Sequence, residues 1–271
     1  MIVLDNGSTD GSLELLRERG DLQLIQLENP GFGAANNVGA KHARGTYLLL
    51  LNSDCELDDG ALATLADFLD SDPRAGIVGP MLRFPDGRLQ RSMGRGPSLL
   101  TELLQKTMLH RIFSYGSYSP RTYYSDRTPD WVTAACMLVR SEVFAAVGGF
   151  DEHFFMLMED LDLCKRVRDA GFAVHYTPRA GAVHHLGGSR GKVSRRMVIE
   201  GERSARRYFH KHHGPHAVKA LRLLSVLEAA VRSAVWLPML ASPRRRASAL
   251  EHLRAYPSLL KRNLDPPAHT D

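Results

Sequence analysis

The chain contains little cysteine and no long apolar run. Its 271 residues include three cysteines, an odd number without paired spacing: Cys55, Cys136 and Cys164. Such a set favours buried thiols in a reducing compartment over a disulfide-stabilised secreted domain. The opening "MIVLDNGSTD" lacks the basic region of a signal peptide. The most apolar stretch, 221–240, is interrupted by charged residues, so we expect no membrane-spanning helix. Together these absences predict a cytoplasmic protein.

Charge is distributed unevenly along the chain. The segment 189–263 contains 17 Lys and Arg against 4 Asp and Glu, whereas the remainder has 18 against 26. An acidic body with a basic C-terminal region suggests an anionic partner, either nucleic acid or a membrane surface. Within this region, Leu223, Leu227, Val231 and Ala234 recur at helical spacing, and Arg244, Arg245 and Arg246 form a cluster. We expect an amphipathic helix that binds the inner face of the plasma membrane or packs on the body.

Strand and helix patterns alternate through the first 189 residues. Apolar runs predict strands and 3.6-residue periodicity predicts helices, whereas residues 95–130 lack clear periodicity. This alternation predicts an α/β fold with a doubly wound, mostly parallel sheet, whose ligands bind beyond the carboxyl ends of the strands. We therefore divide the chain into a catalytic domain, 1–189, and a basic helical region, 190–271. The strands are expected at 2–4, 22–27, 46–51, 76–80 and 132–140, with two further separate strand segments in "FAVHYTP" and "GAVHHLGGS", and the helices at 12–19, 59–69 and 158–171.

The sequence "LLLLNSDCEL" (48–57) places polar residues directly after a buried strand. Mg²⁺ takes oxygen ligands and commonly needs only one or two carboxylates when substrate phosphates complete its coordination. Asn52 and Asp54 are therefore candidates for binding a metal and a diphosphate, although a solvated strand end would have the same composition. Other candidates for nucleotide binding follow the first two strands: Asp5, Asn6, Asp10, Gly31 and Asn37. Asp10 is also a candidate helix cap. A glycine-containing loop by itself is weak evidence for nucleotide binding.

Acidic residues begin the helix predicted at 158–171. Glu159 and Asp160 would stabilise the helix dipole, but a glycine-rich aromatic loop, "GGFDEHFF", precedes them and could form the wall of a substrate site. One of the two carboxylates could then act as a general base. We expect Phe150, Asp151 and Glu152 of this loop on the acceptor side. His184, between a strand and "LGGS", is more often structural in such a position, but it could also complete a metal shell.

Taken in order, five motifs resemble those of family 2 glycosyltransferases with the GT-A fold, and the bacterial rhamnosyltransferase-like enzymes most of all. The motifs are "VLDNGSTDGS", "NPGFGAANNVG", "LLLLNSD", "ACMLVRSEVFAAVGGFDEHFFMLMEDLDLCKRVRDAG" and "HHLGGS", which extend from residue 2 to about 190. The resemblance implies an inverting, metal-dependent transfer of a sugar from a nucleotide diphosphate donor, with Mg²⁺ or Mn²⁺ as cofactor. Rhamnose from a dTDP donor, a glycan or lipid-linked acceptor and a role in cell-wall polysaccharide synthesis are suggested by the resemblance alone.

The resemblance also implies residue roles. Asp5 matches the acid that contacts the nucleotide, Asp54 the last acid of a D-x-D-like motif, and Asp160 the catalytic base, while His184 matches a histidine that ligates metal in some members. Ala134 replaces a common glycine and Leu157 a common aromatic residue. The first strand and helix of the family have no counterpart here. We therefore expect a fragment, a misplaced start or a degenerate member that has an unpaired strand edge and binds its donor weakly.

Three other functions fit parts of the sequence. A non-catalytic relative would bind nucleotide-sugar without turnover, and donor hydrolysis would distinguish it. A nucleotidyltransferase would release pyrophosphate instead of a nucleoside diphosphate. A nucleic-acid-binding protein would use the basic region, but that region has few aromatic residues for base stacking, so we expect no nucleic-acid partner.

Overall fold

The computed structural model describes residues 1–109, 118–185, 195–241 and 246. It divides into two compact units. Unit 1 comprises Met1–Gly96 and Ser117–Ser204, and unit 2 comprises Pro97–Gly116 and Ala205–Asp271. The domain boundary expected at 189 lies outside the described residues.

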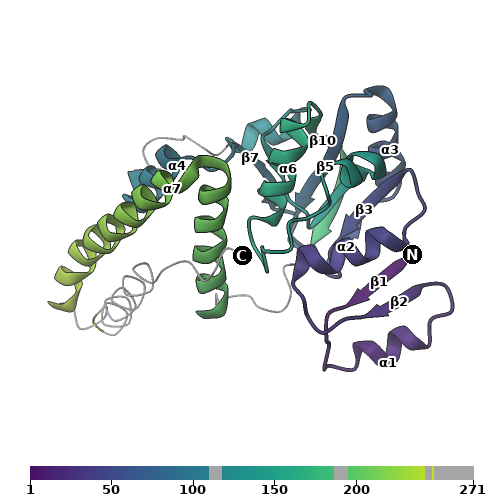
Figure 1. Cartoon of the computed structure of the whole chain (residues 1–271), viewed down its shortest axis with the longest axis horizontal. Helices are drawn as coiled ribbons and strands as arrows, with labels where there is room; N and C mark the ends of the chain where they lie inside the picture. Colours follow the sequence, from purple (N-terminus) through teal and green to yellow (C-terminus); the bar gives the residue numbers. More distant parts are fainter. Residues whose placement is uncertain (110–117, 186–194, 242–245, 247–271) are drawn as a thin grey trace. The chain divides into compact units, whose positions relative to one another are not determined.

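Unit 1 is built around a six-stranded sheet of order β3-β9-β5-β10-β4, with β6 beside β5 (Figure 1). Only β5 and β10 pair in parallel within it, whereas the β3–β9, β5–β9, β5–β6 and β4–β10 pairs are antiparallel. The sheet is therefore mixed rather than mostly parallel, since an apolar run predicts burial but not strand direction. The strands are β3 (Tyr47–Leu51), β4 (Cys55–Leu57), β5 (Ala75–Arg83), β6 (Leu89–Gln90), β9 (Cys136–Arg140) and β10 (Ala173–His184).

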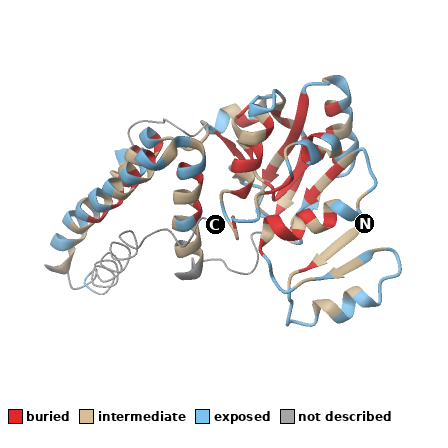
Figure 2. Ribbon diagram, viewed as in Figure 1, coloured by how far each residue is buried: buried red, intermediate tan, exposed pale blue. Residues whose placement is uncertain are grey.

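Helices cover both faces of this sheet. Because successive strand residues point to opposite faces, Ile77 and Val139 pack on one side with α6, whereas Val78 and Leu138 pack on the other with α3. Figure 2 shows these strands as the most buried part of unit 1. Leu65 of α3 is fully buried, and burial of one such side chain contributes about 1.5–3 kcal/mol. The helices of unit 1 are α1 (Ser12–Arg17), α2 (Phe32–His42), α3 (Ala61–Ser71), α5 (Ser141–Ala146), α6 (Glu159–Asp169) and the 3-10 turn η2 (Pro120–Tyr124).

Two short sheets complete unit 1. Strands β1 (Ile2–Asp5) and β2 (Gln23–Gln26) pair in parallel, apart from the six-stranded sheet. Strands β7 (Met93–Gly94) and β8 (Trp131–Val132) form an antiparallel pair. Neither β4 nor the continuity of β10 through residues 178–181 was expected from the sequence, since β4 is short and Pro178 and Gly181 normally interrupt strands.

Unit 2 contains α4 (Leu99–Lys106), most of α7 (Arg195–Trp236) and the 3-10 turn η3 (Leu237–Ala241). Helix α7 is kinked at Gly214, whose φ is 80°, and Pro215 follows it. The Nζ of Lys106 lies 2.9 Å from Oε2 of Glu228, which places α4 beside the second half of α7. By length and composition alone, the segment Ile199–Leu240 could cross a membrane, and only 12% of its apolar window is buried.

Candidate active site

Asp54 and His184 are adjacent because the strands that carry them pair. His184 is the last residue of β10 and is in register with Cys55 of β4, and the His185 amide donates to the Asp54 carbonyl at 2.8 Å. The two side chains then meet, with Nε2 of His184 3.2 Å from Oδ1 of Asp54. The imidazole is buried and the carboxylate is 30% exposed, so this pair opens to solvent on the carboxylate side.

A short backbone segment connects this strand end to the start of α6. The Asn52 amide donates to the carbonyl of Ala135 at 2.9 Å, and the neighbouring Ala134 amide donates to Oδ2 of Asp160 at 3.3 Å. Two consecutive residues therefore contact both the Asn52–Asp54 turn and the carboxylate of Asp160. These hydrogen bonds bring the predicted diphosphate-binding turn and the predicted base to one region of the fold. Asn52 and Asp160 are 108 residues apart in the sequence.

Glu159 and Asp160 have different environments although they are consecutive. Burial, with the neighbouring Asp160 charge, raises the pKa of Glu159 to about 8, and its Oε2 accepts no hydrogen bond from the described residues. Burial also raises the pKa of Asp160, but hydrogen bonds from Ala134, Leu161 and Thr133 oppose that shift. Burial raises the pKa of both carboxyls, and the hydrogen bonds that Asp160 accepts make it the better candidate of the two for the ionised form.

Asn37 joins α2 to the loop that precedes α6. Its Nδ2 donates to the Phe150 carbonyl and to Oε1 of Glu152, both at 2.9 Å, and its Oδ1 accepts from the Phe150 amide at 2.8 Å. Phe150 is 2% exposed and packs edge-on against Phe32 and Phe144. Phe150 thus lies in the core, whereas Glu152 and His153 of the loop are exposed. Asn37 thus binds this loop, a role that the sequence did not indicate.

The glycines at the start of α2 allow the loop that precedes α6 to lie close to this helix. Gly31 has φ of 105°, and a Cβ there would lie 2.6 Å from the Phe155 carbonyl oxygen. A Cβ at Gly33 would lie 2.9 Å from the Phe150 side chain. Gly31 was a candidate for nucleotide binding, but here these glycines permit close approach of the 150–155 loop.

The polar residues after β1 have mainly local partners. Both oxygens of Asp5 accept from the Ser8 amide at 3.3 Å, and Asp5 is 6% exposed. Oδ1 of Asp10 accepts from the amide and hydroxyl of Ser12, at 3.1 and 2.6 Å, and these bonds lower the pKa of Asp10. Asp10 thus forms a local turn before α1, whose N-cap residue is Gly11, so it is not the helix cap that the sequence allowed. Oδ1 of Asn6 is buried and accepts no hydrogen bond from the described residues.

The Asp54–His184 pair satisfies part of what a divalent cation requires. It provides one carboxylate and one imidazole side by side, to which diphosphate oxygens would add, and such a donor set suits Mn²⁺ or Mg²⁺. Across the described residues no group of three or more His, Cys, Asp or Glu side chains is positioned to hold a metal. The site therefore fits a cation that is bound jointly with the substrate, rather than a cage made by the protein alone.

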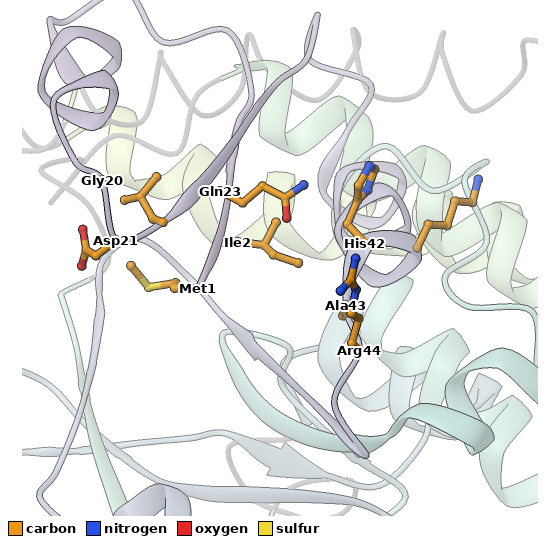
Figure 3. A pocket seen from close by; sticks show the side chains of 10 residues that line it. Met1, Ile2, Gly20, Asp21, Gln23, His42, Ala43 and Arg44 are labelled. Carbon is orange, nitrogen blue, oxygen red and sulfur yellow. The ribbon is translucent and has the colours of Figure 1, made fainter.

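Two hollows lie elsewhere in unit 1. The larger, about 700 Å³, lies between the β1–β2 sheet and the end of α2, and Figure 3 shows Ile2 and Gln23 on one side of it and His42 and Arg44 on the other. None of the predicted site residues lines it. The smaller, about 370 Å³, is lined by Asn37 and Glu152 among others, so it adjoins the loop that precedes α6.

Sequence comparison identifies the family. The model of glycosyl transferase family 2 matches residues 1–147, which is more than half of the chain. The chain is a family 2 glycosyltransferase. It is 33% identical over 216 residues to N-acetylglucosaminyl-diphospho-decaprenol L-rhamnosyltransferase of Mycobacterium tuberculosis, covering 71% of this chain and 68% of the relative. It is 29% identical over 192 residues to the rhamnosyltransferase WbbL of Escherichia coli, covering 68% and 72%.

Solved structures of this glycosyltransferase fold agree with the assignment. The mannosyltransferase PcManGT of Pyrobaculum calidifontis, in complex with GDP-Man and Mn²⁺, superposes with a TM-score of 0.55 at 16% identity, covering 97% of this chain and 74% of that one. GalNAc-T7, with UDP, GalNAc and Mn²⁺, gives the same TM-score and identity, covering 75% and 41%. At this identity the likeness establishes the GT-A fold alone. The predicted family, fold class and enzyme class are confirmed.

Proposed function

We propose that this glycosyltransferase moves a sugar, with inversion at the anomeric carbon, from a nucleotide diphosphate donor to an acceptor hydroxyl. The observation that carries the proposal is the connection through Ala134 and Ala135, which holds the Asn52–Asp54 turn close to Asp160. A diphosphate bound at Asp54 would leave on one side of the sugar, and a hydroxyl activated by Asp160 would attack from the other. One base and a single displacement invert the configuration.

The chain's own residues account for the proton and the leaving group. Asp160 takes the proton from the acceptor hydroxyl as its oxygen bonds to the anomeric carbon, and the bond from that carbon to the donor diphosphate breaks. The electron pair of that bond leaves with the nucleoside diphosphate. Asp54 and His184 would hold a divalent cation, which supplies positive charge opposite the diphosphate. Asp5 and Asn6 remain our proposed nucleotide contacts.

The donor and acceptor are proposed from the relatives. The names of two of them specify rhamnose, and one name specifies a polyprenyl-diphosphate-linked acceptor. We propose a deoxyhexose donor such as dTDP-rhamnose and a lipid-linked sugar acceptor, with Asp151 and Glu152 facing the acceptor. A direct test incubates the enzyme with dTDP-rhamnose, Mn²⁺ and a short-chain polyprenyl-diphospho-N-acetylglucosamine, and it measures dTDP release and the anomeric configuration of the product. A product that retains the donor's configuration would contradict the single displacement.

Asp160→Asn is the first variant to compare with the wild type. It keeps the size of the side chain but removes its basicity, so turnover should fall by roughly 10²–10⁴ while donor binding is retained. Glu159→Gln should lose much less, because Glu159 is already neutral at pH 7. The measurements are kcat with a saturating donor and calorimetric donor affinity. A larger loss from Glu159→Gln than from Asp160→Asn would mean that we have reversed the two roles.

We also propose that α7 associates with an anionic membrane surface, where a lipid-linked acceptor would lie. Between Pro215 and Trp236 its buried positions recur every four residues at Ala217, Leu221, Ser225 and Ala229. Exposed apolar side chains lie away from these positions, with Leu223 71% and Val226 49% exposed. The segment 189–263 adds a net positive charge, and each basic residue near such a surface contributes about 1 kcal/mol. Arg244 and Arg245 of the predicted cluster lie outside the described residues.

Vesicle co-sedimentation tests this association. Binding should increase with the fraction of phosphatidylglycerol, decrease with salt, and be weakened at least tenfold by Leu223→Glu combined with Leu227→Glu. Leu15→Glu is the matched control, since Leu15 is 70% exposed on α1 of unit 1. Binding that is independent of both lipid charge and the double substitution would exclude the proposed surface.

A further inference from the structure

Gln90 contacts the ring nitrogen of His184 that faces away from Asp54. Its Nε2 lies 2.9 Å from Nδ1 of His184, while Nε2 of the same ring lies 3.2 Å from Oδ1 of Asp54. His184 is 5% exposed, so its two nitrogens have few alternative partners. Oε1 of Gln90 is buried and accepts no hydrogen bond from any described residue.

The sheet accounts for this contact. Leu82 of β5 is in register with Gln90 of β6 on one side and with Ala182 of β10 on the other. Residues in register share a face of the sheet, and so do residues two apart on one strand, so Gln90 and His184 point the same way. The tight turn at Asp86 and Gly87, where Gly87 has φ of 79°, returns the chain so that Gln90 arrives at this position. The pairing that gives Gln90 this position was not expected from the sequence.

The observed hydrogen bonds determine where the imidazole proton lies. When the Gln90 amide donates to Nδ1, that nitrogen carries no proton, so the proton of the neutral ring is on Nε2 and points to Asp54. A protonated Nε2 has no lone pair for a cation. Cation binding by Nε2 therefore requires the proton to be on Nδ1, which then needs an acceptor on the Gln90 side.

We infer that Gln90 is a positioning residue whose amide turns by 180° to select the tautomer of His184 that binds a cation. After the turn, Oε1 accepts the Nδ1 proton, and the buried oxygen that lacked a partner gains one. The two ends of an amide have nearly the same shape, so the turn needs no repacking, and histidines that ligate metals commonly donate their second N–H to such an acceptor. An amide is suited to this position because it can serve both arrangements.

This inference rests on the proposed cation site, and the experiment separates the two. Mn²⁺ binding is measured by the EPR signal of the free ion, with dTDP present, for the wild type, Gln90→Leu, Gln90→Glu and His184→Ala. Gln90→Leu, which offers no acceptor, should weaken Mn²⁺ binding roughly 10- to 100-fold. Gln90→Glu, which can only accept, should bind as tightly as the wild type or more tightly. Gln105→Leu on α4 alters an exposed glutamine and should change nothing.

The ¹⁵N spectrum of the histidine ring gives a readout that does not depend on activity. Without cation, the His184 proton should lie on Nε2 in the wild type, and diamagnetic Mg²⁺ with dTDP should move it to Nδ1. In Gln90→Glu, Nδ1 should carry a proton even without the cation. If Gln90→Leu binds Mn²⁺ as the wild type does while His184→Ala does not, the role of Gln90 is wrong and the cation site stands. If the wild type binds no Mn²⁺, both the cation site and this inference fail.

Discussion

Glu159 and Asp160 show how strongly the fold can differentiate two consecutive acidic residues. The first has a buried carboxyl whose Oε2 lacks a partner among the described residues, and the second accepts amide hydrogen bonds from Ala134 and Leu161. The residues alone indicated that one of the pair could be a base, and only the family resemblance assigned that role to Asp160, because the difference arises from residues 133–135 and not from the helix itself. The structure supports Asp160, because hydrogen bonds from Ala134 and Leu161 oppose the rise in the pKa of its carboxyl.

The raised pKa of Glu159 predicts a particular dependence of stability on pH. Its ordinary pKa is 4.5 and its folded value is about 8, so between these pH values the folded state holds a proton that the unfolded state has lost. Stability contributed by this group is therefore fully present below about pH 4.5 and decreases as the pH rises towards 8, by about 1.4 kcal/mol per unit of pKa difference.

Glu159→Gln should remove this decrease, because glutamine does not titrate. Urea unfolding at pH 5, 6, 7 and 8 measures the free energy of unfolding, and the difference between variant and wild type should grow in favour of the variant as the pH rises. Glu142→Gln, on the exposed side of α5, should give a curve parallel to the wild type. A difference independent of pH would show that Glu159 is ionised in the folded protein.

At the scale of elements, α2 and the loop before α6 depend on one asparagine. Asn37→Leu would leave the amide and carbonyl of Phe150 without their partner in a buried place, and each unpaired group costs about 1–3 kcal/mol. The adjacent Asn36 provides a matched control, since its side chain donates only to the Phe32 carbonyl within α2. Urea unfolding should show Asn37→Leu destabilised by at least twice as much as Asn36→Leu. Equal losses would mean that the loop is held by the aromatic packing of Phe150 alone.

The elements themselves were largely predictable, whereas their pairing was not. Apolar runs and caps located β1, β3, α3, α6 and most of β10 within a few residues, because these patterns are local. The direction of β9 relative to β3 was not encoded locally, and it made the sheet mixed. Likewise, the pairing of Asp54 with His184 was inferred only from resemblance, and the contact with Gln90 was missed. Both depend on strand register between residues that are far apart in the chain.

At the scale of the whole molecule, the six-stranded sheet and the β1–β2 sheet differ in how well they are buried. Strands β5 and β9 are buried at nearly every residue. In contrast, Asp5 is the one buried residue among the eight of β1 and β2, and α1 has no buried residue. Local opening of a segment requires little free energy when few apolar contacts are lost. The β1–α1–β2 segment should therefore open on its own, without unfolding of the larger sheet.

Amide hydrogen exchange makes this consequence measurable. The amides of Ile2–Asp5 and Gln23–Gln26 should exchange faster than those of Ile77, Val78 and Leu138 by several orders of magnitude. If Asp5 contacts the nucleotide as proposed, saturating dTDP should slow exchange in β1 and leave the central strands unchanged. Uniform protection across both sheets would mean that they unfold as one unit. If dTDP slows exchange in β1 as expected, the half of the pocket that recognises the nucleotide is assembled, in part, by the nucleotide itself.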